Sequence, residues 1–170
     1  MSADTPSIAD GIDHPLDPRY VSLGRLNGAI GAAALSVASF IGMNVIWIAS
    51  GRLAFGLLLV PAWLALAGLL FWHLQRWPAI AYRHASYRVD ALGIEIRQGV
   101  FWRTITNVPR SRVQHTDVSQ GPIERKFGLG TLVIHTAGTT HSRVTLEGLE
   151  HETARRIRAY LLPTGENDAV

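Results

Sequence analysis

Histidine, serine and acidic residues are the first side chains to examine for chemistry, because the chain has no cysteine. Its seven histidines include His115, His135 and His141, which fall on or beside predicted strands. No two of them have the HxxxH spacing by which one face of a helix binds zinc. Ser111, His115 and Asp117 lie close together, but no Gly-x-Ser-x-Gly turn exposes a nucleophile. The sequence therefore predicts no catalytic residue, no metal site and no cofactor, and a protein that is not an enzyme.

Basic residues form a more promising polar group. Arg110, Arg112 and Gln114 lie in one segment, and Arg125 and Lys126 lie in a second segment further along the chain. If the two segments lie side by side, they form a basic patch that binds a partner or a ligand. Beside an anionic membrane, each exposed basic side chain adds ~1 kcal/mol of attraction. The alternative is ordinary solvated charge with surface ion pairs, which contribute little.

A long apolar block is the first element that must position these residues. Hydrophobic residues make up 48% of the chain and charged residues only 17%, against ~25% in typical soluble domains. Arg52 is the only charged residue between Arg25 and Arg76. A membrane-spanning helix needs ~20 apolar residues. We therefore predict two transmembrane helices, at about 26–49 and 53–74.

Two other interpretations of this block fit less well. A hairpin buried in a soluble helical protein would show an amphipathic period, whereas here all faces are apolar. A cleaved signal peptide would have a basic start and a short apolar core near the N-terminus. This N-terminus instead carries Asp4, Asp10, Asp13 and Asp17, and its apolar run begins late.

Small residues mark one face of the first predicted helix. Ala34, Ala38 and Gly42 recur at four-residue spacing, which allows helices to approach closely. We expect this stripe to pack against the second helix of the same chain, with Asn44 forming a hydrogen bond across the contact. The alternative is a face for association with another chain.

Arginines near the span ends predict the orientation. Arg19 and Arg25 precede the spans, Arg76 and Arg83 follow them, and the connecting turn has only Arg52. The positive-inside rule then places both flanks in the cytoplasm, in a multi-pass protein of the inner membrane. The predicted segments are a flexible polar tail, the two-helix region, a cytoplasmic domain and a disordered tail, at residues 1–19, 20–78, 79–163 and 164–170.

The cytoplasmic domain shows a different pattern. Short alternating runs bounded by turn residues are typical of antiparallel strands. Ala154, Ile157 and Leu161 then share one face of a final helix. Strands are predicted at 86–90, 94–97, 100–108, 113–118, 131–136 and 143–146, with a hairpin turn at 137–140. The residues predicted for the core are Trp102, Phe127, Leu129 and Leu132.

Two motifs in this domain carry a family resemblance. Residues 108–114 read Val-Pro-x-x-Arg-Val-Gln, and residues 121–129 read Gly-Pro-x-x-Arg-x-Phe-Gly-Leu. With two preceding spans, a later Thr-Ala-Gly and a final helix, this order resembles the bacterial pleckstrin-homology-like (PH-like) family, formerly called the membrane-flanked domain. The resemblance covers residues 20–162. It implies a membrane helical hairpin followed by a mainly-β split barrel of about seven antiparallel strands, closed by a C-terminal α-helix.

The resemblance also implies a function. Members of this family resemble interaction modules without a known catalytic role, and are often found beside a longer relative with repeated domains. We therefore predict an inner-membrane protein whose cytoplasmic domain acts as an interaction or scaffolding module. Its predicted partners are the lipid bilayer and either itself or a longer paralogous membrane protein, with no nucleic acid. The alternatives are an anionic-lipid-sensing module, or an accessory subunit of a transporter or envelope stress-response complex.

Overall fold

The computed structural model describes residues 8–51, 53–137 and 143–162. The chain forms two compact units. A helical unit comprises residues 21–79, and a β domain is built from the chain on both sides of it, up to Tyr20 and from Ile80 onward. The β domain therefore depends on segments that are far apart in the sequence.

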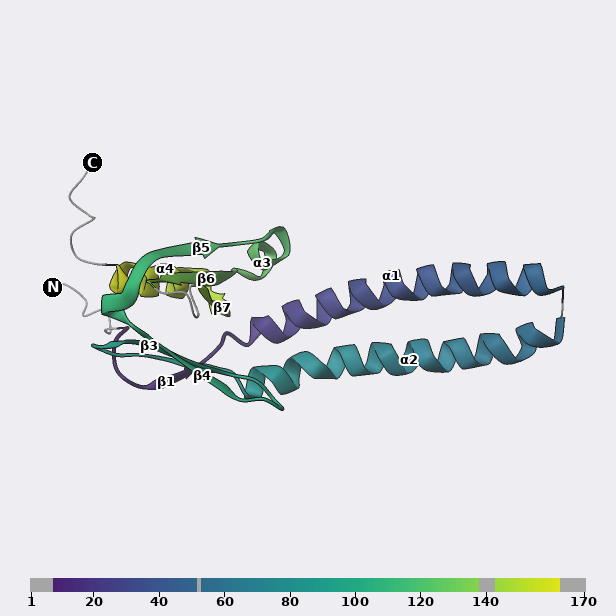
Figure 1. Ribbon diagram of the computed structural model, residues 1–170, viewed down its shortest axis with the longest axis horizontal. Coiled ribbons are helices and arrows are strands. Elements are labelled where there is room, and N and C mark those ends of the chain that lie inside the picture. The colour runs from purple at the N-terminus through teal and green to yellow at the C-terminus, as the bar shows by residue number, and fades with distance from the viewer. Residues whose placement is uncertain (1–7, 52, 138–142, 163–170) are drawn as a thin grey trace. The chain divides into compact units, whose positions relative to one another are not determined.

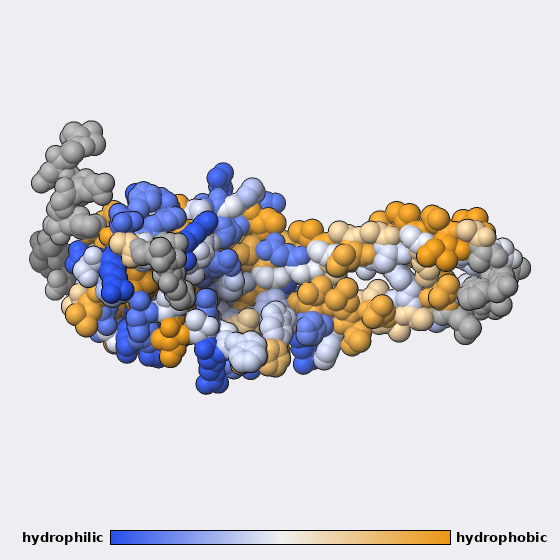
Figure 2. Space-filling model, in the orientation of Figure 1, coloured by the Kyte–Doolittle hydropathy of each residue, from blue (hydrophilic) through white to orange (hydrophobic). Residues whose placement is uncertain are grey.

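Two long helices make up most of the helical unit. Helix α1 (Arg19–Ser50) and helix α2 (Leu53–Arg83) lie side by side (Figure 1) and extend beyond the predicted spans. Many of the apolar side chains described on these helices are exposed, and Ile46 and Leu66 are both about two-thirds exposed. On the face drawn in Figure 2, many hydrophobic residues lie along both helices.

Small residues near the start of α1 bring the helices together. A Cβ atom on Gly24 would lie 2.8 Å from Pro78 Cβ, and one on Gly28 would lie 3.2 Å from the Leu74 carbonyl oxygen. Ala32, four residues further along, is buried. This stripe of Gly24, Gly28 and Ala32 forms the seam because only hydrogen or methyl side chains allow such a close backbone approach.

The stripe that we predicted for this contact lies elsewhere. Ala34 and Ala38 are exposed, and a Cβ atom on Gly42 would have no neighbour within 4 Å. Asn44 donates a hydrogen bond to the Phe40 carbonyl of its own helix, at 2.8 Å, and not across the contact. The expected packing against α2 is therefore wrong, because α1 carries two stripes with the same spacing and spacing alone does not select one.

Within the described residues, one helix is long and apolar enough to cross a membrane. It covers Arg19–Ala49, and only 6% of its most apolar stretch is buried inside the structure. The core helix of a soluble protein would be mostly buried, whereas most of this stretch is exposed in the structure.

Two antiparallel sheets form the β domain. The first has the order β1-β2-β3-β4, from Asp13–Pro15, Ser86–Val89, Gly93–Gln98 and Thr104–Pro109. The second has the order β5-β6-β7, from Val113–Ser119, Leu129–Thr136 and Arg143–Glu150. The 3-10 turn η1 (Arg110–Arg112) joins the sheets, α3 (Pro122–Phe127) follows β5, and α4 (His151–Leu161) ends the domain.

The N-terminal segment supplies a strand that we had predicted to be part of a flexible tail. Strand β1 pairs with β2, with Asp13 opposite Arg88 and Pro15 opposite Ser86. Leu16 follows and is buried in the core, with only 5% of its surface exposed. A three-residue strand containing proline shows no alternating pattern, so its tertiary partner determines its conformation.

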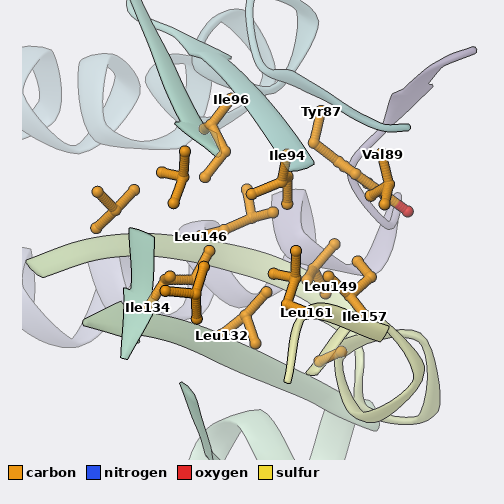
Figure 3. Close-up of a cluster of buried hydrophobic side chains, with 14 of the residues drawn as sticks. Tyr87, Val89, Ile94, Ile96, Leu132, Ile134, Leu146, Leu149, Ile157 and Leu161 are labelled. Atoms are coloured by element: carbon orange, nitrogen blue, oxygen red, sulfur yellow. The ribbon is translucent and has the colours of Figure 1, made fainter. Parts of the chain in front are cut away.

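The hydrophobic core lies between the two sheets and α4 (Figure 3). Ile94 and Ile96 of β3 face Ile134 of β6 and Leu146 of β7 in this cluster. As predicted, one face of the last helix is fully buried, through Ala154, Ile157 and Leu161. Leu129 and Leu132 are also buried as predicted, and Phe127 is half-buried.

One core prediction is wrong. Trp102 is 88% exposed and Phe101 is 81% exposed. The predicted strand 100–108 begins only at Thr104, because Gly99 turns the chain with a positive φ of 110° and residues 99–103 form a loop. The predicted turn at 137–140 falls largely outside the described residues.

The docking of the N-terminal segment gives a testable prediction. Replacing Leu16 with alanine should lower the free energy of unfolding of the β domain by about 2–5 kcal/mol, because it leaves a cavity in the core. Pulse proteolysis of the full chain in denaturant measures this quantity. The control is Ile12→Ala, at a side chain that is 61% exposed. Equal stabilities for the two variants would contradict the assignment.

Candidate interaction surface

Arg110 has a structural role in the first motif. Its guanidinium lies 4.6 Å from the centre of the Tyr160 ring, and it donates a hydrogen bond to the Leu162 carbonyl at 3.3 Å. Tyr160 in turn donates a hydrogen bond to the Asp90 carbonyl. Arg110 thus joins the turn between the sheets to the end of α4, which leaves it poorly placed to bind a separate ligand.

Arg112 and Gln114 have more exposed positions. Both side chains reach solvent, from the end of η1 and the start of β5. Arg112 lines a cavity of about 250 Å³ together with the whole of β4, Thr136 and Val144. Strand β4 is the last strand of its sheet, so this groove runs beside an open strand edge. Open edges are surfaces to which another strand can pair.

The second motif builds a short, firmly held helix. The Glu124 carboxylate accepts hydrogen bonds from the Gly121 amide, at 2.6 Å, and from the Thr131 hydroxyl, at 2.8 Å. Gly128 ends the helix in the left-handed conformation, with φ of 66°. The Gly-Pro start and the Phe-Gly end of the motif therefore specify α3 and its attachment to β6, by the usual capping chemistry.

Arg125 and Lys126 are exposed on the last turn of α3. They do not join Arg110 and Arg112, because the seven-residue strand β5 lies between the two groups (Figure 1). A strand of that length spans about 20 Å. The structure thus splits the five candidates between two ends of β5 and does not form the single patch that we considered.

Histidines form a surface cluster on the second sheet. His115 Nε2 lies 2.9 Å from Asp117 Oδ1, and His135 Nε2 lies 3.7 Å from Asp117 Oδ2. The two imidazole rings are 5.8 Å apart. The side chains of His115, His135 and Asp117 are all well exposed. Ser111 lies on a different element, η1. No group of three or more His, Cys, Asp or Glu residues that could hold a metal was found in the part of the chain that the structure describes.

Sequence reasoning missed a cavity of about 550 Å³ beside the docked N-terminal segment. Leu16 and Tyr20 line it together with Ala81, Trp102 and Glu147. The Tyr20 hydroxyl donates a 3.0 Å hydrogen bond to the Glu147 carboxylate. Because its walls come from the N-terminal segment, the end of α2, the β3–β4 hairpin and β7, no local pattern in the sequence indicates it.

Comparisons with known proteins agree with this architecture. The family model described as a bacterial PH domain matches residues 29–164, most of the chain. This protein belongs to the bacterial PH domain family. In the described part of the chain, seven antiparallel strands in two sheets and a C-terminal helix are consistent with a PH-like fold.

A curated relative adds one more comparison. The chain is 42% identical over 81 residues to UPF0699 transmembrane protein YdbS of Bacillus subtilis (strain 168). The match covers 48% of this chain and 49% of the relative, so the alignment spans about half the length of each protein. No solved structure matches the chain.

The contact between Tyr20 and Glu147 predicts a pH effect. Burial raises the pKa of Tyr20 to about 12, and the nearby Glu147 carboxylate adds to this shift. An unfolded chain releases the tyrosine proton at a pKa of about 10. The folded state therefore keeps a proton that the unfolded state loses, and this part of the stability disappears as the pH rises from about 10 to about 12.

Tyr20→Phe should consequently reduce the alkaline loss of stability. Denaturant midpoints of the full chain in mild detergent, compared between neutral and alkaline pH, measure the difference. Glu147→Gln is the matched variant: it keeps the burial but removes the carboxylate, so its effect should be intermediate. An unchanged alkaline loss in Tyr20→Phe would show that Tyr20 does not hold its proton in this way.

Proposed function

We propose that this protein is an integral membrane protein in which α1 and α2 both cross the inner membrane and the β domain is a non-catalytic interaction module in the cytoplasm. The main support is the exposed apolar surface of α1, from Arg19 to Ala49. Burying such a surface in lipid is favourable, whereas exposing it to water is costly. The likeness to a protein named as a transmembrane protein supports the same proposal.

The pairing of β1 with β2 supports two crossings. Pro15 lies before α1 and pairs with Ser86, which lies after α2. Hydrogen-bonded strands must occupy the same compartment, so the chain between them crosses the membrane an even number of times. If α1 spans the membrane, α2 must return across it.

Aromatic and basic residues near the end of the second predicted span support the orientation. The Arg76 guanidinium lies 5.0 Å from the centre of the Trp72 ring, and the rings of His73 and Trp77 are 5.8 Å apart. Tryptophan and arginine are enriched where a cytoplasmic flank meets the headgroups. This end of α2 then lies at the cytoplasmic face, as does Arg25 at the corresponding end of α1.

The open edge of β4 is the surface proposed for the partner. Ile105 on this strand is 60% exposed, and Arg112 lines the adjacent groove. An added strand would satisfy the backbone groups along the edge and place a side chain in the groove. The partner proposed for this edge is a second copy of the chain or a longer membrane protein with repeated domains of the same type.

A second candidate role is that of an accessory subunit in a larger membrane complex. It is favoured by the small-residue stripe of Ala34, Ala38 and Gly42, which α2 leaves uncovered. By contrast, lipid sensing through one patch of Arg110, Arg112, Arg125 and Lys126 loses support, because β5 separates these residues.

Cysteine labelling tests the membrane topology, since the chain has no native cysteine. Ala49→Cys, near the turn between the helices, should react with a membrane-impermeant maleimide in intact cells whose outer membrane is permeable. Ile12→Cys and Ser111→Cys, both exposed in the β domain, should react only after the inner membrane is opened. Labelling of Ser111→Cys in intact cells would contradict the orientation.

Photo-crosslinking tests the interaction role. A benzophenone amino acid at Ile105, in the full-length protein in native membranes, should give adducts with a second copy or another bacterial PH domain protein. The control is the same group at Leu92, which is 81% exposed on the turn between β2 and β3. Recovery of monomer alone from Ile105, or equal adducts from both positions, would count against the β4 edge.

A further inference from the structure

The loop between β3 and β4 exposes two large aromatic side chains. It comprises residues 99–103, which we call the aromatic loop. Trp102 is 88% exposed, the highest value among the large hydrophobic residues that the structure describes. Phe101 is 81% exposed, the same value as Leu92. An apolar ring pair displayed together to solvent is unfavourable in water and is typical of a contact surface.

The backbone conformation at Gly99 and the pairing of the flanking strands hold the aromatic loop as a tight hairpin. Gly99 adopts a φ of 110°, and a Cβ atom there would lie 1.9 Å from the Trp102 carbonyl oxygen. Only glycine fits such a turn. Gln98 and Thr104, on either side of the loop, are paired across the two strands. The tip is therefore a closed hairpin, and its rings do not fold back into the core.

Two arginines, one in the loop and one near it, line a common cavity. Arg103 at the end of the loop and Arg83 at the end of α2 line one cavity of about 330 Å³, together with His84. Neither arginine forms an ion pair with any residue that the structure describes. Arg97 also lines this cavity, but its charge is compensated by Glu95 and Asp13.

The aromatic loop shares a cavity with the segment where the chain leaves α2. Gly99 and Trp102 line the same cavity as Ala81 and Ala85, and all four belong to the β domain. From Arg76 to Arg83 the chain is one helix, which covers about 10 Å. Headgroup layers extend the bilayer by several ångströms on each side of the hydrocarbon core. If α2 spans the membrane, a loop beside its last turn is within reach of the headgroups.

We propose that the aromatic loop inserts Phe101 and Trp102 into the headgroup region of the anionic bilayer that holds the helices, while Arg83 and Arg103 bind lipid phosphates. Aromatic rings with a polar edge favour this interface, and arginine matches the phosphate in geometry and charge. The proposal rests on the membrane anchoring of α1 and α2. The exposed turn between β2 and β3 differs, because it presents a single aliphatic side chain, Leu92, whose backbone amide donates to the Asp90 carboxylate.

Site-specific fluorescence in proteoliposomes tests the proposal. Single-cysteine variants Phe101→Cys and Trp102→Cys of the full chain are labelled with a polarity-sensitive dye and reconstituted in phosphatidylcholine containing phosphatidylglycerol. Each variant keeps the other aromatic ring. The expected result is a blue-shifted emission that brominated lipids quench and aqueous iodide does not. Leu92→Cys, which is equally exposed at the other end of β3, is the matched control and should show the opposite pattern.

Further variants separate the possible failures. A label at Ile41→Cys, on the exposed face of α1, should be quenched by brominated lipids if the membrane anchoring is correct. Quenching at Ile41 without any at Phe101 and Trp102 would overturn the loop proposal alone, whereas no quenching at Ile41 would overturn the anchoring. Disulfide-linked dimers through Trp102→Cys would likewise reject the loop proposal, in favour of contact with a second copy.

The charge contribution is measured in the same system. Arg83→Glu with Arg103→Glu should reduce the blue shift at Trp102→Cys in vesicles with phosphatidylglycerol, and should have little effect in phosphatidylcholine alone. Arg125→Glu with Lys126→Glu, also exposed but on α3, is the matched charge reversal and should leave the shift unchanged. Equal effects of the two pairs would show a general electrostatic attraction and no specific contact at the loop.

Discussion

Strand β1 precedes both long helices in the chain and pairs with β2, which follows them. The segments before α1 and after α2 therefore belong to one β domain. The buried side chain of Leu16 and the hydrogen bond from the Asp17 amide to the Gly148 carbonyl fix this segment between the sheet and β7. The cavity at Tyr20 exists because of it. The pairing also limits the membrane topology, since paired strands cannot lie on opposite sides of a bilayer.

The motifs that carry the family resemblance have mainly structural roles here. Glu124 holds the start of α3, and Arg110 joins η1 to α4. Such residues stabilise connections in which several backbone groups need partners, and these connections define the fold. Arg112 of the first motif is exposed and lines the groove beside β4, whereas the aromatic loop lies outside both motifs. A match to the family therefore indicates the architecture more directly than it indicates the partner.

Exposed apolar surface occurs in two forms in this protein. On α1 it is extensive and leaves only the seam with α2 covered, which suits lipid hydrocarbon. In the aromatic loop it is confined to two rings, with arginines near by, which suits an interface between apolar and polar surroundings. Trp102 illustrates the limit of composition as a guide. Tryptophan in a run rich in β-branched residues usually packs in a core, but the turn at Gly99 moves this one to solvent.

The sequence by itself determined the elements whose physics is local or periodic. These are the two apolar helices, which a long run almost without charge indicates. They are also the alternating strands from residue 86 onward and the buried face of α4, where the hydrophobic period records the solvent that each side chain meets. Tertiary structure decided the rest. It selected Gly24 and Gly28 over Ala34 and Ala38 as the helix seam, recruited Asp13–Pro15 as a strand, and separated Arg112 from Arg125 along β5. Each of these outcomes depends on which distant segment a residue meets, and equal spacing or equal charge in the sequence does not contain that information.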